Sequence, residues 1–314
     1  MRAAILTAFN GPQGVSVIPD APTPPVGNTD VLVRIWGGGL NPADLKTTEG
    51  MLPYLNLPYV MGHDLIGDVV GIGHGVVDFD LGDVVVGNLG FAGGAFAELA
   101  SVPSKLLAKL PDDVPPGAAA VLPVIGLTAM QAVRDIGNVA SGDRVLIHGA
   151  SGSVGSLASQ LAKAAGAYVY GTGSGPKAAQ MREDGVDTVI DYRSMSFTDI
   201  IAPGSLDFVL DTVGGETLRK SASLLKPSGI LVSIVTSDVV SLAALAGVKG
   251  KFLVIDTSGT QIAELLRMVG NGRLRLRVGR TFALRDIRQA FQSLDRGDGG
   301  KILVVVDETS PIGA

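Results

Sequence analysis

The stretch from Arg144 to Gly155 constrains the fold of this chain more than any other. It reads Arg-Val-Leu-Ile-His-Gly-Ala-Ser-Gly-Ser-Val-Gly. The stretch contains an apolar run and a glycine-rich turn, and a helical pattern of small residues follows it. A strand, a glycine turn and a helix in this order let a pyrophosphate approach free backbone N–H groups at the positive end of the helix dipole. Ala150 stands where the pattern G-x-G-x-x-G has its first glycine, and alanine disfavours positive φ.

We interpret this turn as the phosphate-binding turn of a dinucleotide site, because it lies between a predicted strand and a predicted helix. The alternative is a tight turn of the kind that any α/β protein contains. The residues expected to bind the cofactor here are Ala150, Ser151, Gly152, Ser153, Val154 and Gly155.

Composition narrows the classes of protein. The 314 residues predict two domains, and the absence of cysteine excludes disulfides, cysteine nucleophiles and cysteine-rich zinc sites. A net charge of −5 argues against binding to nucleic acid or an anionic membrane. The N-terminus lacks the long apolar run of a signal peptide, so we expect a cytoplasmic protein. Residues 114–133 are uncharged and long enough to span a bilayer, but their prolines and glycines favour a buried hinge followed by a helix.

Apolar runs alternate with helical patterns from residue 144 onward, which predicts a parallel sheet covered on both faces. The six predicted strands are Val145–His148, Tyr168–Thr172, Thr188–Asp191, Asp207–Thr212, Ile230–Val235 and Phe252–Ile255, and the predicted helices are 153–165, 176–184, 215–225 and 239–247. Six strands are the number in a full Rossmann sheet.

The two ends of the chain have a different pattern. Short apolar runs between Pro and Gly clusters predict a mostly β domain in the first 110 residues. The last segment returns to strand, turn, helix and strand, and its apolar end, 301–306, is expected to rejoin the N-terminal domain. Arg273, Arg275 and Arg277 alternate, which predicts one face of a solvated edge strand; a nucleic-acid surface is the alternative.

Four blocks are similar to those of a known family. They are Asn41-Pro-Ala-Asp44, the glycine-rich stretch from Gly62 to Val84, Leu122-Pro123 through Thr128-Ala129, and the turn at His148–Gly155, with Gly299-Gly300-Lys301 near the end. Together they resemble the zinc-free quinone oxidoreductase (zeta-crystallin-like) branch of the medium-chain dehydrogenase/reductase superfamily. The resemblance covers nearly the whole chain.

The resemblance implies an α/β fold with a doubly wound Rossmann sheet and a GroES-like, mostly β catalytic domain. We expect the GroES-like domain to comprise residues 1–120 and 273–314 and the NADP-binding Rossmann domain residues 121–272, with the active site in the cleft between them. A homodimer formed through edge strands of the Rossmann sheet is also implied. No metal is expected, because His63 alone cannot supply the three protein ligands of a catalytic zinc.

The end of the second predicted strand indicates the cofactor. NAD-binding sheets carry an acidic residue about 20 residues past the glycine motif, whereas this chain has Gly171-Thr-Gly-Ser-Gly-Pro-Lys177 there. Hydroxyls and a lysine suit the 2′-phosphate of NADP. We therefore expect Gly173, Ser174 and Lys177 to bind NADP, and the resemblance adds Tyr192. The alternatives are a solvated lysine and a tyrosine in ordinary packing.

Few residues are predicted to act on the substrate, since hydride transfer needs mainly orientation and a dry pocket. Asn41 is the candidate to contact the nicotinamide or the substrate carbonyl, with an Asn-Pro turn as its alternative. Tyr54 is a second candidate on the substrate side, with packing as its alternative. Thr128, at the start of the predicted hinge helix, resembles the residue near the cofactor phosphates, with helix capping as its alternative. No proton donor is identified beyond water or Asp44, which is better suited to capping.

Three functions remain open. The first is NADPH-dependent reduction of quinones, and the second is NADPH-dependent reduction of an enone or alkenal double bond on the same scaffold. The third is a protein that binds NADPH for a structural or regulatory purpose with little turnover. The small-molecule substrate itself cannot be identified from these residues.

Overall fold

The computed structural model describes residues 1–52, 55–297 and 300–313, so Tyr54 and Gly299 lie outside the described residues. The chain divides into two compact units. Unit 1 comprises Met1–Leu127 and Asp256–Ala314, and unit 2 comprises Thr128–Ile255. Each unit is described by itself.

Unit 2 contains the predicted doubly wound sheet. Its six strands are all parallel and lie in the order β11-β10-β9-β12-β13-β14. Their bounds are β9 Arg144–Ile147, β10 Tyr168–Gly173, β11 Thr188–Asp191, β12 Leu206–Asp211, β13 Leu225–Ser233 and β14 Lys249–Phe252. This is the Rossmann strand order, in which the direction of the winding reverses between the first and the fourth strand, here β9 and β12.

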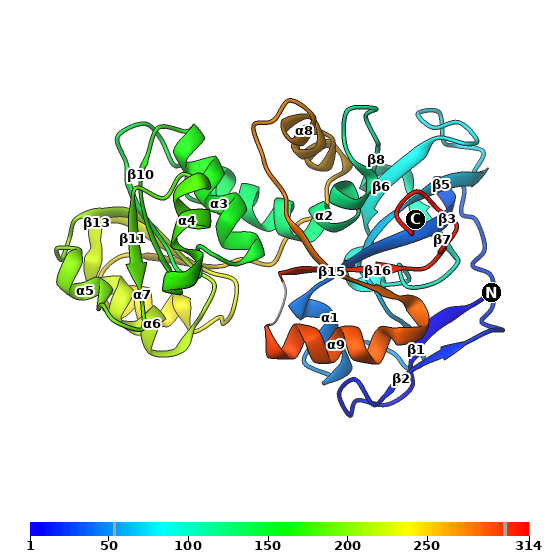
Figure 1. Ribbon diagram of the computed structural model, residues 1–314, viewed down its shortest axis with the longest axis horizontal. Coiled ribbons are helices and arrows are strands. Elements are labelled where there is room, and N and C mark those ends of the chain that lie inside the picture. Colours follow the sequence, from blue (N-terminus) through cyan, green and yellow to red (C-terminus); the bar gives the residue numbers. More distant parts are fainter. Residues whose placement is uncertain (53–54, 298–299, 314) are drawn as a thin grey trace. The chain divides into compact units, whose positions relative to one another are not determined.

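The helices of unit 2 follow its strands in turn, and they cover the sheet (Figure 1). They are α3 Ser153–Ala164, α4 Ala178–Glu183, α5 Phe197–Ile200, α6 Gly215–Ser221 and α7 Val239–Leu245. The central strands are buried on both sides, since Val145, Leu146 and Ile147 of β9 have no exposed surface. Continuous apolar runs are typical of such strands, which explains why the sequence predicts them closely.

Unit 1 is built on two sheets whose strands pair antiparallel, except that β15 and β16 pair parallel. A seven-stranded sheet has the order β15-β16-β3-β5-β6-β8, with β7 also paired to β3, and a smaller sheet has the order β2-β1-β4. The strands are β1 Ala3–Leu6, β2 Val15–Ile18, β3 Asp30–Leu40, β4 Tyr59–Val60, β5 Asp64–Ile72, β6 Val84–Asn88, β7 Leu99–Pro103, β8 Leu107–Lys109, β15 Val278–Ala283 and β16 Lys301–Val305. The helices are α1 Pro42–Thr48, most of α2 Pro116–Met130, α8 Gly259–Gly270 and α9 Ile287–Arg296.

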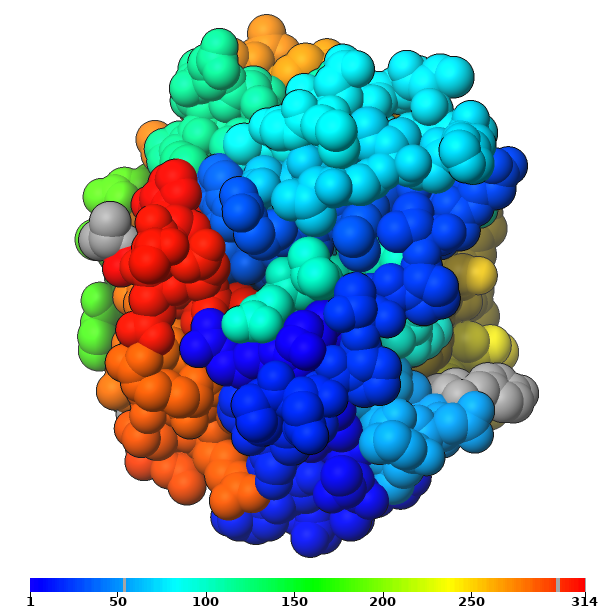
Figure 2. Space-filling model, turned by 90° about the vertical axis from the view of Figure 1, so that its right-hand side faces the viewer, coloured from blue at the N-terminus to red at the C-terminus, as the bar shows by residue number. Residues whose placement is uncertain are grey.

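The two ends of the chain meet in unit 1. Strand β16 pairs antiparallel with β3, as the sequence predicts for its apolar C-terminal run. Arg2 donates to the carbonyl of Val306, and Arg288 in α9 donates to the carbonyl of Val15. Figure 2 shows the orange and red C-terminal segments on the same face as the blue N-terminal ones.

Three consecutive glycines in β3 allow close packing around this junction. A Cβ on Gly38 would lie 1.7 Å from the carbonyl oxygen of Asp64, and one on Gly37 would lie 2.3 Å from that of Val304. A Cβ on Gly39 would lie 2.9 Å from both Lys301 Nζ and Asp64 Oδ2. The side chains of Asp64 and Lys301 therefore occupy space that glycine leaves open.

Three expectations about element positions differ from the structure. The sixth strand of unit 2, predicted at Phe252–Ile255, is β14 at Lys249–Phe252, so the two share only Phe252. Helix α8, which the sequence places with the nucleotide-binding domain, packs on β6 and β8 of unit 1, and a Cβ on Gly259 would lie 2.3 Å from the carbonyl of Leu107. The arginines at 273, 275 and 277 do not lie in a strand, since α8 ends at Gly270 and β15 begins only at Val278. Gly272, with φ of +73°, turns the chain between them.

Helix α2 continues through a π-helical turn, Gln131–Ile136. Among the described residues, the segment Pro116–Ile136 is long and apolar enough to span a bilayer, but 78% of its most apolar window is buried inside the protein. That degree of burial is typical of the core helix of a folded domain.

Candidate functional site

A pocket of about 770 Å³ lies within unit 2 at the carboxyl ends of its central strands. Its lining begins with His148 and Gly149 after β9 and with Thr172 and Gly173 at the end of β10. The loop after β11, residues 192–197, forms another wall, and Val213, Thr217 and Lys220 complete it. The pocket thus includes the point where the winding of the sheet reverses, which is where ligands bind in such sheets.

The glycine turn at this pocket has the geometry that phosphate binding requires. Gly149 carries the positive φ of the turn, +67°, so Ala150 does not need one. A Cβ on Gly155 would lie 2.2 Å from the carbonyl oxygen of Gly149, so the third glycine lets the helix begin against the turn. Helix α3 starts at Ser153 after Gly152, which supplies no side-chain cap, and its first N–H groups suit an anion.

His148 lies beneath the turn with both ring nitrogens bonded. Its Nδ1 is 3.1 Å from Thr172 Oγ1 and its Nε2 is 2.8 Å from Ser221 Oγ. Ser221 donates its own proton to the carbonyl of Thr217, so Nε2 carries the ring proton and Nδ1 accepts from Thr172. Burial lowers the pKa of His148 to about 4, which keeps it neutral.

The expected 2′-phosphate residues lie at the ends of β10 and β11. Ser174 is half-buried, Lys177 is exposed, and Tyr192 is 61% exposed and lines the pocket. Arg193, which the sequence reasoning missed, also lines it and holds its guanidinium 5.8 Å from the centre of the Tyr192 ring. The carboxylate of Asp191 lies beside Gly175 in this region, since a Cβ on Gly175 would be 2.5 Å from Asp191 Oδ2.

The structure therefore brings Ser151, Gly173 and Tyr192 together around one pocket, with the remaining turn residues beside them in the chain. Apart from Tyr192, sequence reasoning missed the loop after β11, and it missed the wall from α6. The rule that carboxyl ends of parallel strands meet at one edge could have found both. Thr128 lies in the last turn of α2, which begins at Pro116, so it does not cap the start of that helix.

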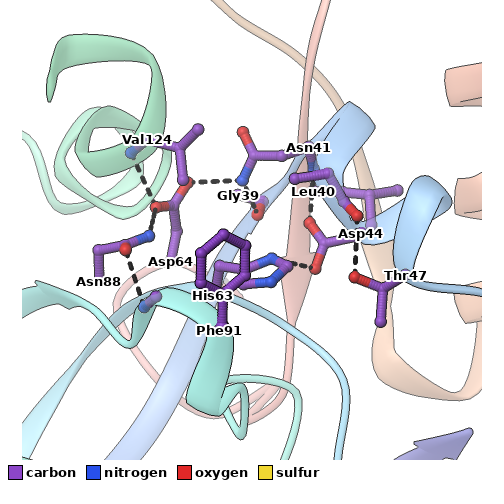
Figure 3. A network of polar contacts seen from close by, with 12 residues as sticks. Gly39, Leu40, Asn41, Asp44, Thr47, His63, Asp64, Asn88, Phe91 and Val124 are labelled. Atoms are coloured by element: carbon purple, nitrogen blue, oxygen red, sulfur yellow. Dashed lines mark hydrogen bonds and ion pairs between the residues drawn. The ribbon is translucent and has the colours of Figure 1, made fainter. Parts of the chain in front are cut away.

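Asn41 belongs to a separate buried network in unit 1 (Figure 3). It has no exposed surface and precedes α1, where its backbone N–H donates to Asp44 Oδ2 at 2.8 Å. Its Nδ2 donates to Gly39 O at 3.0 Å and to Asp64 Oδ2 at 2.9 Å, and its Oδ1 accepts from the Lys301 ammonium. Both amide protons are engaged, so only Oδ1 has a lone pair left for a further partner.

The Asp64 carboxylate is the centre of this network. Besides Asn41, it accepts from Asn88 Nδ2 at 3.0 Å and from the backbone N–H of Val124 in α2 at 2.9 Å (Figure 3). Lys301 Nζ lies 3.7 Å from Asp64 Oδ2 and donates to the Leu40 carbonyl at 3.1 Å. Burial raises the pKa of Asp64 and lowers that of Lys301, so each group depends on the other as its counter-charge.

His63 completes this region and differs from His148. It is 4% exposed, and its Nδ1 lies 2.8 Å from Asp44 Oδ1. Burial lowers the pKa of His63, but the carboxylates of Asp44 and Asp64 together outweigh burial, and the net result is a pKa above the ordinary value. Among the described residues, its Nε2 has no hydrogen-bond partner.

Comparison with known proteins identifies the family to which the fold belongs. Residues 27–112 match the alcohol dehydrogenase GroES-like domain, and residues 185–304 match a domain described as zinc-binding dehydrogenase. In the described part of the chain, no group of three or more His, Cys, Asp or Glu side chains could hold a metal ion.

Solved structures and curated relatives agree with these domain matches. The quinone oxidoreductase of Coxiella burnetii is 30% identical with a TM-score of 0.92, covering 98% of this chain and 99% of that one. A mycobacterial protein solved in complex with NADPH is 28% identical with a TM-score of 0.87, covering 98% and 100%. The acryloyl-coenzyme A reductase of Sulfurisphaera tokodaii is 27% identical over 94% of this chain and 97% of its own length.

Some relatives are much longer than this chain. A polyketide synthase subunit of Mycobacterium tuberculosis is 31% identical over 90% of this chain, which spans only 14% of that protein. From the domain matches and the full-length structural likeness, this chain belongs to the quinone oxidoreductase-like branch of the medium-chain dehydrogenase/reductase superfamily.

Proposed function

We propose that this protein is an NADPH-dependent quinone reductase that works without zinc. The observation that carries the proposal is the pocket of unit 2. Its lining includes Tyr192 and Arg193, and Lys177 follows shortly after Gly173 of the same lining in the sequence. The solved quinone oxidoreductase with a TM-score of 0.92 supports the acceptor class. The NADPH-bound mycobacterial neighbour supports the cofactor.

The residues present fit NADPH. The turn at Gly149–Gly155 and the start of α3 would hold the pyrophosphate, and Ser174, Lys177 and Tyr192 would hold the 2′-phosphate. Arg193 adds a second cation to offset the Asp191 carboxylate. When bound, the reduced nicotinamide supplies the hydride, and the protein supplies orientation and exclusion of water.

Asn41 would act in this reaction as an acceptor. Because both its amide protons are engaged, it cannot donate to a substrate carbonyl without breaking a bond to Gly39 or Asp64. Its Oδ1 would accept an N–H group, such as that of a carboxamide, and Lys301 would keep the amide in this orientation. Thr128 near the cofactor phosphates and Tyr54 beside the substrate stay predictions.

Reduction of a conjugated C=C bond is the second candidate. Two observations favour it. The buried Nε2 of His63, which has no hydrogen-bond partner in the part of the chain that the structure describes, could provide the proton that such a reduction needs. The acryloyl-coenzyme A reductase is similar over nearly its whole length.

We also propose a homodimer formed through β14. This strand is one edge of the sheet in unit 2, so its outer backbone groups have no strand partner in the described chain. The side chains of Val240, Leu245 and Val254 around it are 52%, 87% and 53% exposed. Pairing with the same edge of a second copy would bond the outer backbone groups of β14 and cover these apolar side chains. Light scattering on the purified protein tests this, and a monomer at micromolar concentration would contradict it.

The function is tested by following NADPH oxidation with 1,4-benzoquinone and with a simple α,β-unsaturated ketone in parallel, with NADH as control. Faster turnover of the quinone with NADPH supports the first candidate, and a preference for the ketone supports the second. Tight NADPH binding without turnover of either acceptor would contradict both and favour a structural or regulatory protein.

A further inference from the structure

A carboxylate lies where the sequence predicts a cofactor site without one. Asp191, the last residue of β11, pairs in register with Gly173 of β10. Its Oδ2 would lie 2.5 Å from a Cβ on Gly175, so the carboxylate lies against the loop that follows β10. NAD-binding sheets supply an acid from the end of their second strand, whereas here the third strand, β11, supplies it. The absence of an acid directly after β10 therefore does not decide the cofactor by itself.

The loop after β11 is closed by backbone hydrogen bonds and tied to β10. The N–H of Tyr192 donates to the carbonyl of Gly173 at 3.2 Å, and the N–H of Met195 donates to the carbonyl of Asp191 at 2.9 Å. The N–H of Arg193 donates to Asp191 Oδ1 at 3.1 Å. The carboxylate thus stabilises the loop with one of its two oxygens, and the loop holds Arg193 near the end of β10.

Arg193 brings the opposite charge to the same loop. Its side chain is exposed and lines the pocket of unit 2 together with Tyr192, and its guanidinium lies 5.8 Å from the centre of the Tyr192 ring. A guanidinium beside an aromatic ring retains its N–H donors, two of which can bind one phosphate. Lys220, also a lining residue, belongs to α6 and so to a different wall. Arg193 is therefore the lining cation nearest in the chain to Asp191.

The two charges on this loop have opposite effects on the two forms of the cofactor ribose. NADH carries a hydroxyl at the 2′ position, and NADPH carries a phosphate of about −1.5 to −2 charge there. A carboxylate accepts a hydrogen bond from the hydroxyl and repels the phosphate. A guanidinium binds the phosphate through charge-assisted hydrogen bonds. Discrimination between two ligands often combines such an attractive and a repulsive element.

We propose that Asp191 and Arg193 form an opposed pair that sets the preference between NADPH and NADH. Arg193 binds the 2′-phosphate, whereas Asp191 repels it and accepts a 2′-hydroxyl, so the preference depends on the balance of the two charges at the ribose. This inference rests on the proposed NADPH-dependent function and deepens it, because it names residues of unit 2 that select the cofactor. It involves no residue of unit 1.

The variants must remove charge without removing the loop. Asparagine has nearly the shape of aspartate, and its Oδ1 can accept the Arg193 N–H as the carboxylate does. Asp191→Asn therefore retains the hydrogen bond that stabilises the loop and removes the charge. Arg193→Gln removes the cation and keeps an amide donor. Lys220→Gln is the matched control, since it removes a cation from another wall of the same pocket.

The test measures the dissociation constants of NADPH and NADH by fluorescence titration for the unmodified protein and the three variants. Arg193→Gln should weaken NADPH binding about tenfold or more and leave NADH binding unchanged, because it removes charge-assisted bonds to the phosphate. Asp191→Asn should tighten NADPH binding severalfold and weaken NADH binding. Lys220→Gln should leave the ratio of the two constants unchanged. Equal losses for both cofactors in Arg193→Gln, or the same change of ratio in Lys220→Gln, would overturn the proposal.

A second measurement confines the effect to the adenosine half of the cofactor. Adenosine 2′,5′-bisphosphate and adenosine 5′-monophosphate differ by the same phosphate and contain no nicotinamide. Calorimetric titration of both should give the same shifts in the variants. If neither cofactor binds the unmodified protein, the proposed function fails and the inference fails with it. If both cofactors bind and the ratio of their constants is the same in every variant, only the inference about Asp191 and Arg193 fails.

Discussion

The stability of unit 2 should fall in mild acid because of His148. Its folded-state pKa of about 4 lies below the value of 6.5 expected in the unfolded chain. The unfolded state therefore binds the proton first, so the contribution to stability is complete above pH 6.5 and is lost as the pH falls toward 4. At about 1.36 kcal/mol per pKa unit, this shift corresponds to about 3 kcal/mol, of which about 2 kcal/mol is lost by pH 5.

The physical origin of this effect is the hydrogen-bond chain of the ring. A protonated Nδ1 would face Thr172 Oγ1, whose proton now points toward it and whose lone pair accepts from the N–H of Gly149. Thr172 would have to turn its hydroxyl away, which disturbs the glycine turn that we propose as the phosphate site. His148→Gln removes the titration and retains a donor near Ser221.

The assay is hydrogen exchange of the β9 and β10 amides in urea at pH 7 and pH 5, for the unmodified protein and His148→Gln. Exchange is preferred to fluorescence because the sole tryptophan, Trp36, lies in β3 of unit 1. We expect the free energy of unfolding to drop by about 2 kcal/mol more in the unmodified protein than in the variant. The same drop in both proteins would refute the reasoning, because it would place the pH dependence in other groups.

Three further outcomes follow from contacts described above. Lys177→Ala should weaken NADPH binding about tenfold and leave NADH binding unchanged, measured by fluorescence titration, because charge-assisted bonds contribute about 1.5–3 kcal/mol and this lysine is exposed; equal losses for both cofactors would contradict it. Lys301→Met should lower the free energy of unfolding of unit 1 by about 3–5 kcal/mol, followed by tryptophan fluorescence in urea, because Asp64 stays buried without its counter-charge; a change under 1 kcal/mol would be inconsistent with that dependence. Gly38→Ala should destabilise unit 1 by at least about 1–3 kcal/mol in the same assay, since its Cβ would lie 1.7 Å from a backbone oxygen, whereas Gly117→Ala, with open space in α2, should not; similar behaviour of the two variants would argue against the close packing of β3.

The sheet of unit 2 could be predicted closely because its information is local. Continuous apolar runs such as 145–147 specify strands buried on both faces, and the glycine turn marks where the strand ends and the helix begins. The arginines at 273–277 show the limit of such patterns. Alternation over so few residues does not specify a strand. The three arginines lie between the turn at Gly272 and the first residue of β15, Val278.

The cofactor pocket could be predicted only in part. Ser151, Gly173 and Tyr192 were predicted and line the pocket, and Lys177 stays a prediction, whereas Arg193 and Lys220 line the pocket without having been predicted. Asn41 was predicted to contact the nicotinamide or the substrate, but its amide protons are taken by Gly39 and Asp64, and its Oδ1 accepts from Lys301, which lies 260 residues away. Contacts of this kind have no local signal.

What the sequence by itself determined is the set of elements and the family: the strands and helices after residue 144, the glycine turn after β9, and the motifs shared with quinone oxidoreductases. These follow from periodicity, turn chemistry and short motifs, which act over a few residues. The tertiary structure decided that β16 joins β3 and that Asp64 and Lys301 neutralise each other. It also decided that each ring nitrogen of His148 has a partner, whereas Nε2 of His63 has none among the described residues. The physical reason is that burial and charge compensation depend on which distant segments pack together, and only the folded chain settles that.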